Sequence, residues 1–190
     1  MISKKIISKK QKFQSKLFTL WEVDVKINKK KQTWETVSLN GVTKSVMIIP
    51  ITSDNKIILI KKFCTASNTY EYVLPGGKVE REELLKQTAK RELIEEIGFE
   101  PKELIPLGPF KILPAYLVGT TYGFIGKNLK INQKYFEEEI EILKKSAFTL
   151  QEILEMIKNK KIRDVRTVAI LLYFFTFFHC QNDCLAPQHH

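Results

Sequence analysis

Three glutamates near the end of one segment have a spacing that suits metal chemistry. Residues 83–97 contain no Gly or Pro and are rich in helix-forming residues, so we expect a helix that ends at Gly98. Glu92 is followed by Glu95 and Glu96, so the three carboxylates share one side of the last turn. Such like charges repel, and carboxylates at a helix C-terminus also meet the unfavourable end of the helix dipole. A bound Mg²⁺ would remove both penalties, and an acidic face covered by water is the alternative interpretation.

A longer pattern surrounds these glutamates. It consists of Gly77, Glu83, Arg91-Glu92, Glu95-Glu96 and Gly98 at fixed spacing. With each residue type at roughly 5–7% usage, seven fixed positions match by chance about once in 10⁸ starting points. The pattern is similar, without departure, to the signature of the Nudix family. The resemblance implies a hydrolase of nucleoside diphosphates linked to another moiety, which uses Mg²⁺ or Mn²⁺.

The resemblance also implies a role for each residue of the pattern. Glu92 and Glu96 would be the main metal ligands, Arg91 would orient the glutamates, and Gly76 would offer its carbonyl oxygen. The remaining residues would support the loop and the metal ligands. The expected catalytic residues within the pattern are Arg91, Glu95 and Glu96, and the expected metal ligands are Gly76, Glu83, Glu92, Glu95 and Glu96.

A second acidic cluster, Glu137 to Glu139, precedes the apolar alternation of Ile140 and Ile142. Nudix enzymes of the ADP-ribose type carry an acidic cluster in this region, and one of its glutamates serves as catalytic base or extra metal ligand. We take Glu138 as the catalytic candidate. The neighbouring glutamates leave the register open, and a solvated run of charge is the alternative.

Four residues are candidates for substrate binding: Trp34, Glu35, Lys62 and Tyr116. An aromatic ring could stack on a nucleotide base, although an aromatic residue at strand spacing belongs more often to the core. The resemblance favours Trp34 and Glu35, because the N-terminal extension of ADP-ribose-type enzymes helps to form the nucleotide pocket.

Position 64 departs from the pattern of ADP-ribose-type enzymes, many of which have an arginine there that meets substrate phosphate. This chain has Lys61-Lys62-Phe63-Cys64. A lysine at position 61, 62, 78 or 111 could supply the missing cation. Stretches such as SVMIIPI and IILIKKF more closely resemble the bacterial branch of the family that hydrolyses several ADP compounds.

The composition fits one globular domain with a basic surface. The chain has 190 residues, of which 44% are hydrophobic, and a formal net charge of +10. A basic protein could bind nucleic acid, an acidic membrane surface or a polyanionic small molecule. The lysines are spread along the chain and no nucleic-acid-binding signature occurs, which favours the small molecule.

Three further features indicate the cellular compartment of the protein. The cysteines lack the spacing of a metal site or of a disulfide framework. The first residues lack the apolar segment of a signal peptide, and the apolar run over residues 168–178 is too short to span a bilayer. We therefore expect a cytoplasmic protein.

Alternation and turn signals divide the chain into four parts. Residues 1–16 predict a basic flexible arm, and residues 17–43 a β-hairpin extension that in related enzymes pairs subunits. Residues 44–180 would form the Nudix domain, an α/β/α sandwich with a mixed sheet, and residues 181–190 a tail. Within the domain we expect strands at 44–52, 56–63, 70–74, 104–107 and 116–125, and helices at 83–97, from 150 to about 158, and from near 164 through the aromatic run.

These features together predict metal-dependent hydrolysis of the diphosphate linkage in ADP-ribose, NADH or diadenosine polyphosphates, with release of AMP and a phosphorylated product. We also expect a homodimer, with neither a membrane nor a nucleic acid as partner. Two alternatives stay open: a hydrolase of RNA ends or other nucleotide diphosphates, and a ligand-sensing module without catalysis. Modules of the second kind usually lose glutamates of the pattern, and this chain has kept all of them.

Overall fold

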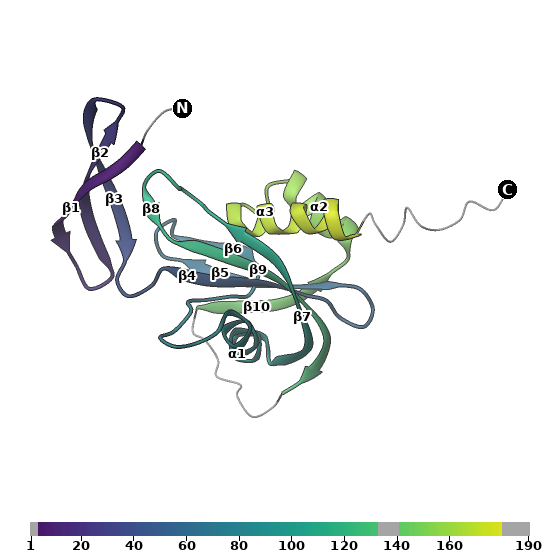
Figure 1. Ribbon diagram of the computed structural model, residues 1–190. Coiled ribbons are helices and arrows are strands. Elements are labelled where there is room, and N and C mark those ends of the chain that lie inside the picture. The colour runs from purple at the N-terminus through teal and green to yellow at the C-terminus, as the bar shows by residue number, and fades with distance from the viewer. Residues whose placement is uncertain (1–3, 133–140, 180–190) are drawn as a thin grey trace.

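Paired strands of both directions form the centre of the molecule, seen in a computed structural model that describes residues 4–132 and 141–179 (Figure 1). One three-stranded sheet has the order β4-β9-β7, in which β4 and β9 are parallel and β9 and β7 antiparallel. A second has the antiparallel order β10-β5-β6. The strands are β4 (Lys44–Pro50), β5 (Ile57–Cys64), β6 (Thr69–Val73), β7 (Phe99–Phe110), β9 (Thr120–Ile131) and β10 (Ile142–Phe148). The predicted mixed β-structure is therefore confirmed.

Both faces of these strands are buried, and this produces the layers. In β4, Val46 and Ile48 belong to the core beneath α1 (Leu85–Ile97), whereas Met47 and Ile49 belong to the core on the opposite face. That second core is closed by α2 (Leu150–Lys158), by α3 (Val165–Phe174) and by the π-helical turn Phe175–His179. Figure 1 shows α1 on one side of the strands and α2 and α3 on the other. The continuous apolar run of β4 is therefore the expected sequence of a strand covered on both faces, and the predicted α/β/α sandwich is confirmed.

The helix of the acidic pattern has the predicted ends and buried face. Ala89 and Leu93 are 0% exposed and pack against the strands. Gly98 adopts the left-handed conformation at φ 78°, and its N–H donates to the carbonyl of Ile94 at 3.0 Å. The helix begins at Leu85 rather than at residue 83, because residue 83 is still part of the preceding loop.

The N-terminal extension has three strands rather than two. The predicted hairpin consists of β2 (Phe18–Ile27) and β3 (Lys30–Leu39). Residues 1–16 were expected to be a flexible arm, and this prediction is wrong for β1 (Lys4–Gln14), which pairs antiparallel with β2. All eleven residues of β1 are exposed, so the strand has no buried face that would produce an apolar alternation in the sequence. Its backbone pairing and polar contacts such as the ion pair of Lys12 with Glu22 at 2.9 Å hold it instead.

A short parallel pairing joins the extension to the domain. β8 (Leu117–Val118) lies beside the end of β3, and the N–H of Val37 donates to the carbonyl of Tyr116 at 2.7 Å. This contact brings the extension against the loop before β9. Among the described residues, no helix combines the length and the apolar character needed to cross a membrane.

Candidate active site

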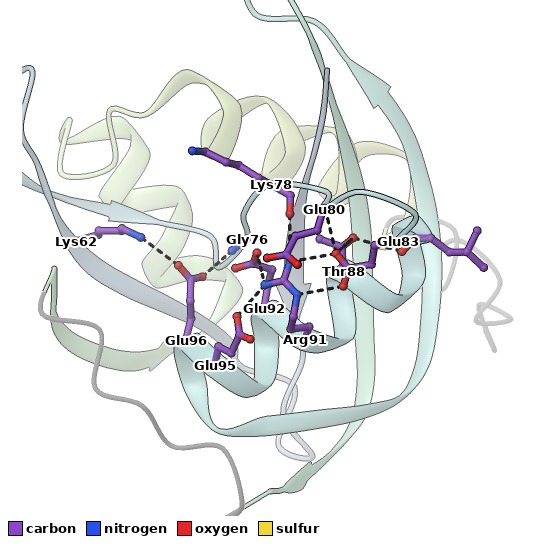
Figure 2. Close-up of polar contacts among 11 residues, drawn as sticks. Lys62, Gly76, Lys78, Glu80, Glu83, Thr88, Arg91, Glu92, Glu95 and Glu96 are labelled. Carbon is purple, nitrogen blue, oxygen red and sulfur yellow. Dashed lines mark hydrogen bonds and ion pairs between the residues drawn. The ribbon is translucent and has the colours of Figure 1, made fainter. Parts of the chain in front are cut away.

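The guanidinium group of Arg91 contacts one glutamate before α1 and two glutamates within it (Figure 2). Its Nε and Nη2 donate to the two carboxylate oxygens of Glu83 at 3.0 and 3.2 Å. Its Nη1 donates to Glu92 at 2.9 Å and to Glu95 at 2.8 Å, and its Nη2 also donates to the carbonyl of Lys78 at 3.1 Å. One side chain therefore connects the loop before α1 with two of the glutamates in its last turns.

These contacts keep Arg91 and Glu83 ionised. The hydrogen bond to Glu83 is the largest cause that raises the pKa of Arg91 above its usual range, while burial opposes the rise and Glu92 and Glu95 add to it. The same hydrogen bond lowers the pKa of Glu83. Both partners therefore carry their full charge at neutral pH.

Glu96 occupies the deepest position of the cluster. Its side chain is 1% exposed, and its Oε2 accepts a hydrogen bond from the N–H of Gly76 at 2.7 Å. Its Oε1 lies 3.3 Å from the Nζ of Lys62 (Figure 2). The same Nζ also lies 3.4 Å from Glu141. A buried carboxylate is costly unless hydrogen bonds and an opposite charge compensate it, and Glu96 has both.

The two glycines before α1 allow the loop to approach its neighbours closely. A Cβ atom at Gly76 would lie 2.2 Å from the backbone oxygen of Val46 in β4. A Cβ atom at Gly77 would lie 2.2 to 2.5 Å from the carboxylate atoms of Glu92. The loop is also bonded to β4, because the N–H of Val46 donates to the carbonyl of Gly77 at 2.8 Å. Glycine at these positions therefore brings backbone and carboxylates into one small volume.

A pocket of about 370 Å³ opens beside this loop. Its walls come from the end of the extension at Leu39, from the start of β4, from the segment before β9 and from the first turn of α3. Its charged lining residues are Lys44, Lys62, Lys78, Glu96 and Arg166. Four basic side chains and one carboxylate suit a ligand that carries several negative charges.

The structure brings together only part of the residues predicted for the site. Lys62 lines the pocket, but Trp34, Glu35 and Tyr116 do not. Trp34 is 42% and Tyr116 56% exposed. Glu138 lies outside the described residues. The roles of Trp34, Glu35 and Tyr116 in substrate binding and of Glu138 in catalysis stay predictions.

Arg166 is one of two charged pocket residues, with Lys44, that the sequence did not reveal. It lies far along the chain from the acidic pattern, in the first turn of α3. The predicted start of this helix near Asp164 is confirmed, but no local signal tells which wall of which pocket the first turn reaches.

The donor atoms fit a hard divalent cation, although they do not yet surround one. Glu92, Glu96 and the Gly76 carbonyl offer oxygen ligands, which Mg²⁺ prefers. Among the described residues, however, no three acidic, His or Cys side chains converge as a ready metal site. The carboxylates turn instead to Arg91 and Lys62, so a cation would have to compete with these two side chains for Glu92 and Glu96.

The two glycines are expected to respond differently to substitution. Gly76→Ala should lower the free energy of unfolding by about 1–3 kcal/mol, because the new methyl meets the backbone of Val46. Gly77→Ala should cost less, because the end of the flexible Glu92 side chain can move away. Gly119→Ala is the control, since its nearest contact would be at 3.9 Å. Thermal denaturation ranks the variants, and equal melting temperatures for the changes at 76 and 119 would contradict the described packing.

Comparison with known proteins agrees with this arrangement. Residues 42–169 match the model of the NUDIX domain. The chain is 28% identical over 174 residues to the ADP-ribose pyrophosphatase of Bacillus subtilis (strain 168), with 90% of this chain and 92% of that protein covered. It is 30% identical over 176 residues to the methanol dehydrogenase activator of Bacillus methanolicus, with 91% and 93% covered. It is also 26% identical over 159 residues to the ADP compounds hydrolase NudE of Escherichia coli (strain K12), with 83% and 84% covered.

The fold is likewise shared with a solved structure. The crystal structure of an ADP compounds hydrolase superimposes with a TM-score of 0.82, at 24% sequence identity, over 94% of this chain and 95% of that one. The domain match spans more than half of the chain and includes the whole acidic pattern, the glycine loop and most of the pocket. The chain therefore belongs to the Nudix hydrolase family.

Proposed function

We propose that this protein hydrolyses the diphosphate linkage of ADP-containing compounds such as ADP-ribose, NADH and diadenosine polyphosphates, with a divalent metal ion. The observation that carries this proposal is the position of Glu96, which lines a basic pocket and is hydrogen-bonded to the glycine loop. A diphosphate in this pocket would lie beside the carboxylates of α1. The names of the relatives from Bacillus subtilis and Escherichia coli support the substrate class.

The chain's own residues would divide the work between binding and positioning. Nudix hydrolases generally use a divalent metal, and we propose Mg²⁺ or Mn²⁺ held by Glu92 and Glu96, with Glu95 and the Gly76 carbonyl as further ligands. Such an ion neutralises phosphate charge and lowers the pKa of a bound water. Arg91 would keep the glutamates aligned.

Proton transfer and phosphate binding would fall to other side chains. We propose Glu138 as the group that accepts the proton of the attacking water, on the ground of the family resemblance alone. Lys62 and Lys78 line the pocket and would attract the diphosphate by their charge. Attack on ADP-ribose would release AMP and ribose 5-phosphate.

Two alternative functions differ from the proposed one in the substrate that is bound or in whether it is cleaved. The net charge of +10 could serve a hydrolase of RNA ends. A ligand-sensing module would bind the nucleotide without cleaving it. Among described residues, the lysines of β1 lie on the extension, whereas the pocket of about 370 Å³ is lined by β4, the glycine loop and the segment before β9, which favours a small nucleotide.

The activity is tested with a panel of ADP-ribose, NADH, a diadenosine polyphosphate and capped RNA in the presence of Mg²⁺. We expect the first three to be hydrolysed. Glu96→Gln should lower kcat by about 100-fold or more, because the charge toward the metal is lost. Its melting temperature should change little, because the Gln oxygen can still accept the Gly76 N–H. The matched control is Glu103→Gln, an exposed site on β7. Full activity of a folded Glu96→Gln protein would refute the assignment.

We also propose that the chain forms a homodimer through its N-terminal extension. β1 is an edge strand of its sheet, and edge strands are open to pairing with another chain. Apolar side chains on the extension, such as Ile6 and Phe13, are 63% and 62% exposed. These features support the proposal that a second chain covers this surface of the extension. On the ground of the family resemblance, the extension would also help to form the nucleotide pocket.

Light scattering at micromolar concentration should give about twice the chain mass of 22.1 kDa. Phe13→Glu should shift the population toward monomer, because it places a charge among the exposed apolar residues. Leu172→Glu, on the exposed side of α3, is the control and should leave the dimer intact. A monomer in the unmodified protein would overturn the proposal.

A further inference from the structure

The first turn of α3 brings an arginine to the wall of the pocket. Arg166 lines the same pocket as Lys62, Glu96 and the glycine loop. Its side chain is 40% exposed, so it is partly held and partly open to a ligand. It belongs neither to the acidic pattern nor to the lysines that the sequence suggested as phosphate-binding groups.

The position of Arg166 is determined by an anchored helix end. Oδ1 of Asp164 accepts hydrogen bonds from the N–H and the hydroxyl of Thr167, each at 2.9 Å. The same hydroxyl of Thr167, fully buried, accepts the N–H of Leu74 at 3.2 Å. Leu74 directly precedes the turn that contains the two glycines. The first turn of α3 is therefore attached to the strand that leads into the site.

Asp164 orients the guanidinium group of Arg166 but does not use all of its N–H donors. Nε and Nη2 of Arg166 each lie 3.3 Å from Oδ2 of Asp164, a longer contact than the 2.8 to 3.0 Å of the main Arg91 contacts. Its Nη1 has no partner among the described residues. Asp164 therefore aligns the side chain through one edge, and N–H donors remain for an anion. Arginine binds phosphate in a bidentate manner through such a fork.

Position 64, close to Arg166, has no side chain that could bring a positive charge to a substrate phosphate. Cys64 is short and neutral, and it lies close enough to Arg166, Asp164 and Glu71 for their charges to act on its thiol. Burial is the main cause that raises the pKa of Cys64, so the thiol stays protonated and offers no charge. Arg166 reaches the same neighbourhood from another element and brings a positive charge to it.

We propose that Arg166 binds a phosphate group of the substrate and so takes the place of a cation at position 64. The inference rests on the proposed function, because it assigns a substrate-binding residue to that pocket. Its chemistry requires a ligand with a phosphate or diphosphate group. Lys62 contributes less to this task, because it already faces Glu96 and Glu141.

Binding is measured by calorimetry with α,β-methylene-ADP, whose diphosphate cannot be hydrolysed, and with adenosine, which has no phosphate. Arg166→Ala should weaken binding of the analogue by about 10- to 100-fold, the range of a lost charge-assisted hydrogen bond. Arg166→Lys should lie between the two, because it keeps the charge but loses the fork. Any affinity for adenosine should be the same in all variants.

The matched control is Arg163→Lys, the same change three positions earlier. Arg163 donates to Glu71 at 3.2 Å and does not line the pocket, so this variant should bind the analogue like the unmodified chain. Melting temperatures show which variants are folded. If Arg166→Ala does not fold, Arg166→Lys still tests the loss of the fork.

The outcomes separate this inference from the proposed function. If the unmodified protein hydrolyses the panel but a folded Arg166→Ala or Arg166→Lys protein binds the analogue as tightly as it does, the inference is wrong and the function stands. If the panel is not hydrolysed but the changes at 166 weaken binding, the inference stands and the enzymatic proposal falls. Failure of the unmodified protein to bind the analogue at all would overturn the inference.

Discussion

The site depends on one guanidinium group that holds carboxylates which would otherwise repel. Arg91 contacts Glu83 with two nitrogen atoms and reaches Glu92 and Glu95 with a third, so that three negative charges are kept in defined positions. Its contact with the carbonyl of Lys78 ties the glycine loop to the same group. A lysine could not make this set of contacts, because it has neither the planar fork nor the number of donors.

The layered fold explains how a charged residue can be buried beside this cluster. α1 buries Ala89 and Leu93 against the strands, and Glu96 lies one turn further toward the glycine loop. The loop returns a backbone hydrogen bond, and Lys62 brings a positive charge from β5. The cost of removing the carboxylate from water is thereby offset. A metal ion that displaces Lys62 would find the negative charge of Glu96 in place.

Local signals allowed much of the fold to be predicted from the sequence. The end of α1 at Gly98, the hairpin within residues 17–43 and the helix from residue 150 to about 158 all depend on residues a few positions apart, and all three are found. β7 was expected only at residues 104–107 but spans twelve residues from Phe99. Its prolines weaken the strand signal in the sequence. They are tolerated because β7 is an edge strand, paired with β9 alone among the described strands.

What escaped prediction depends on contacts between distant segments. β1 has no buried face, so its sequence carries no apolar alternation although its backbone is paired along its length. The contact of Lys62 with Glu96 joins residues on a strand and a helix, and Arg166 lies at the pocket on a helix turn that Thr167 attaches to the distant Leu74. No spacing rule within one segment reports such encounters.

We propose that Glu92, which is held by Arg91, and Glu96, which is held by the N–H of Gly76, form the site for a divalent cation. The most direct measurement is a titration of Mn²⁺ followed by electron paramagnetic resonance, with the unmodified protein, Glu92→Gln and the control Glu103→Gln. We expect saturable Mn²⁺ binding that Glu92→Gln weakens by about tenfold or more and that Glu103→Gln leaves unchanged. Equal Mn²⁺ affinity in the unmodified protein and in a folded Glu92→Gln protein would contradict it.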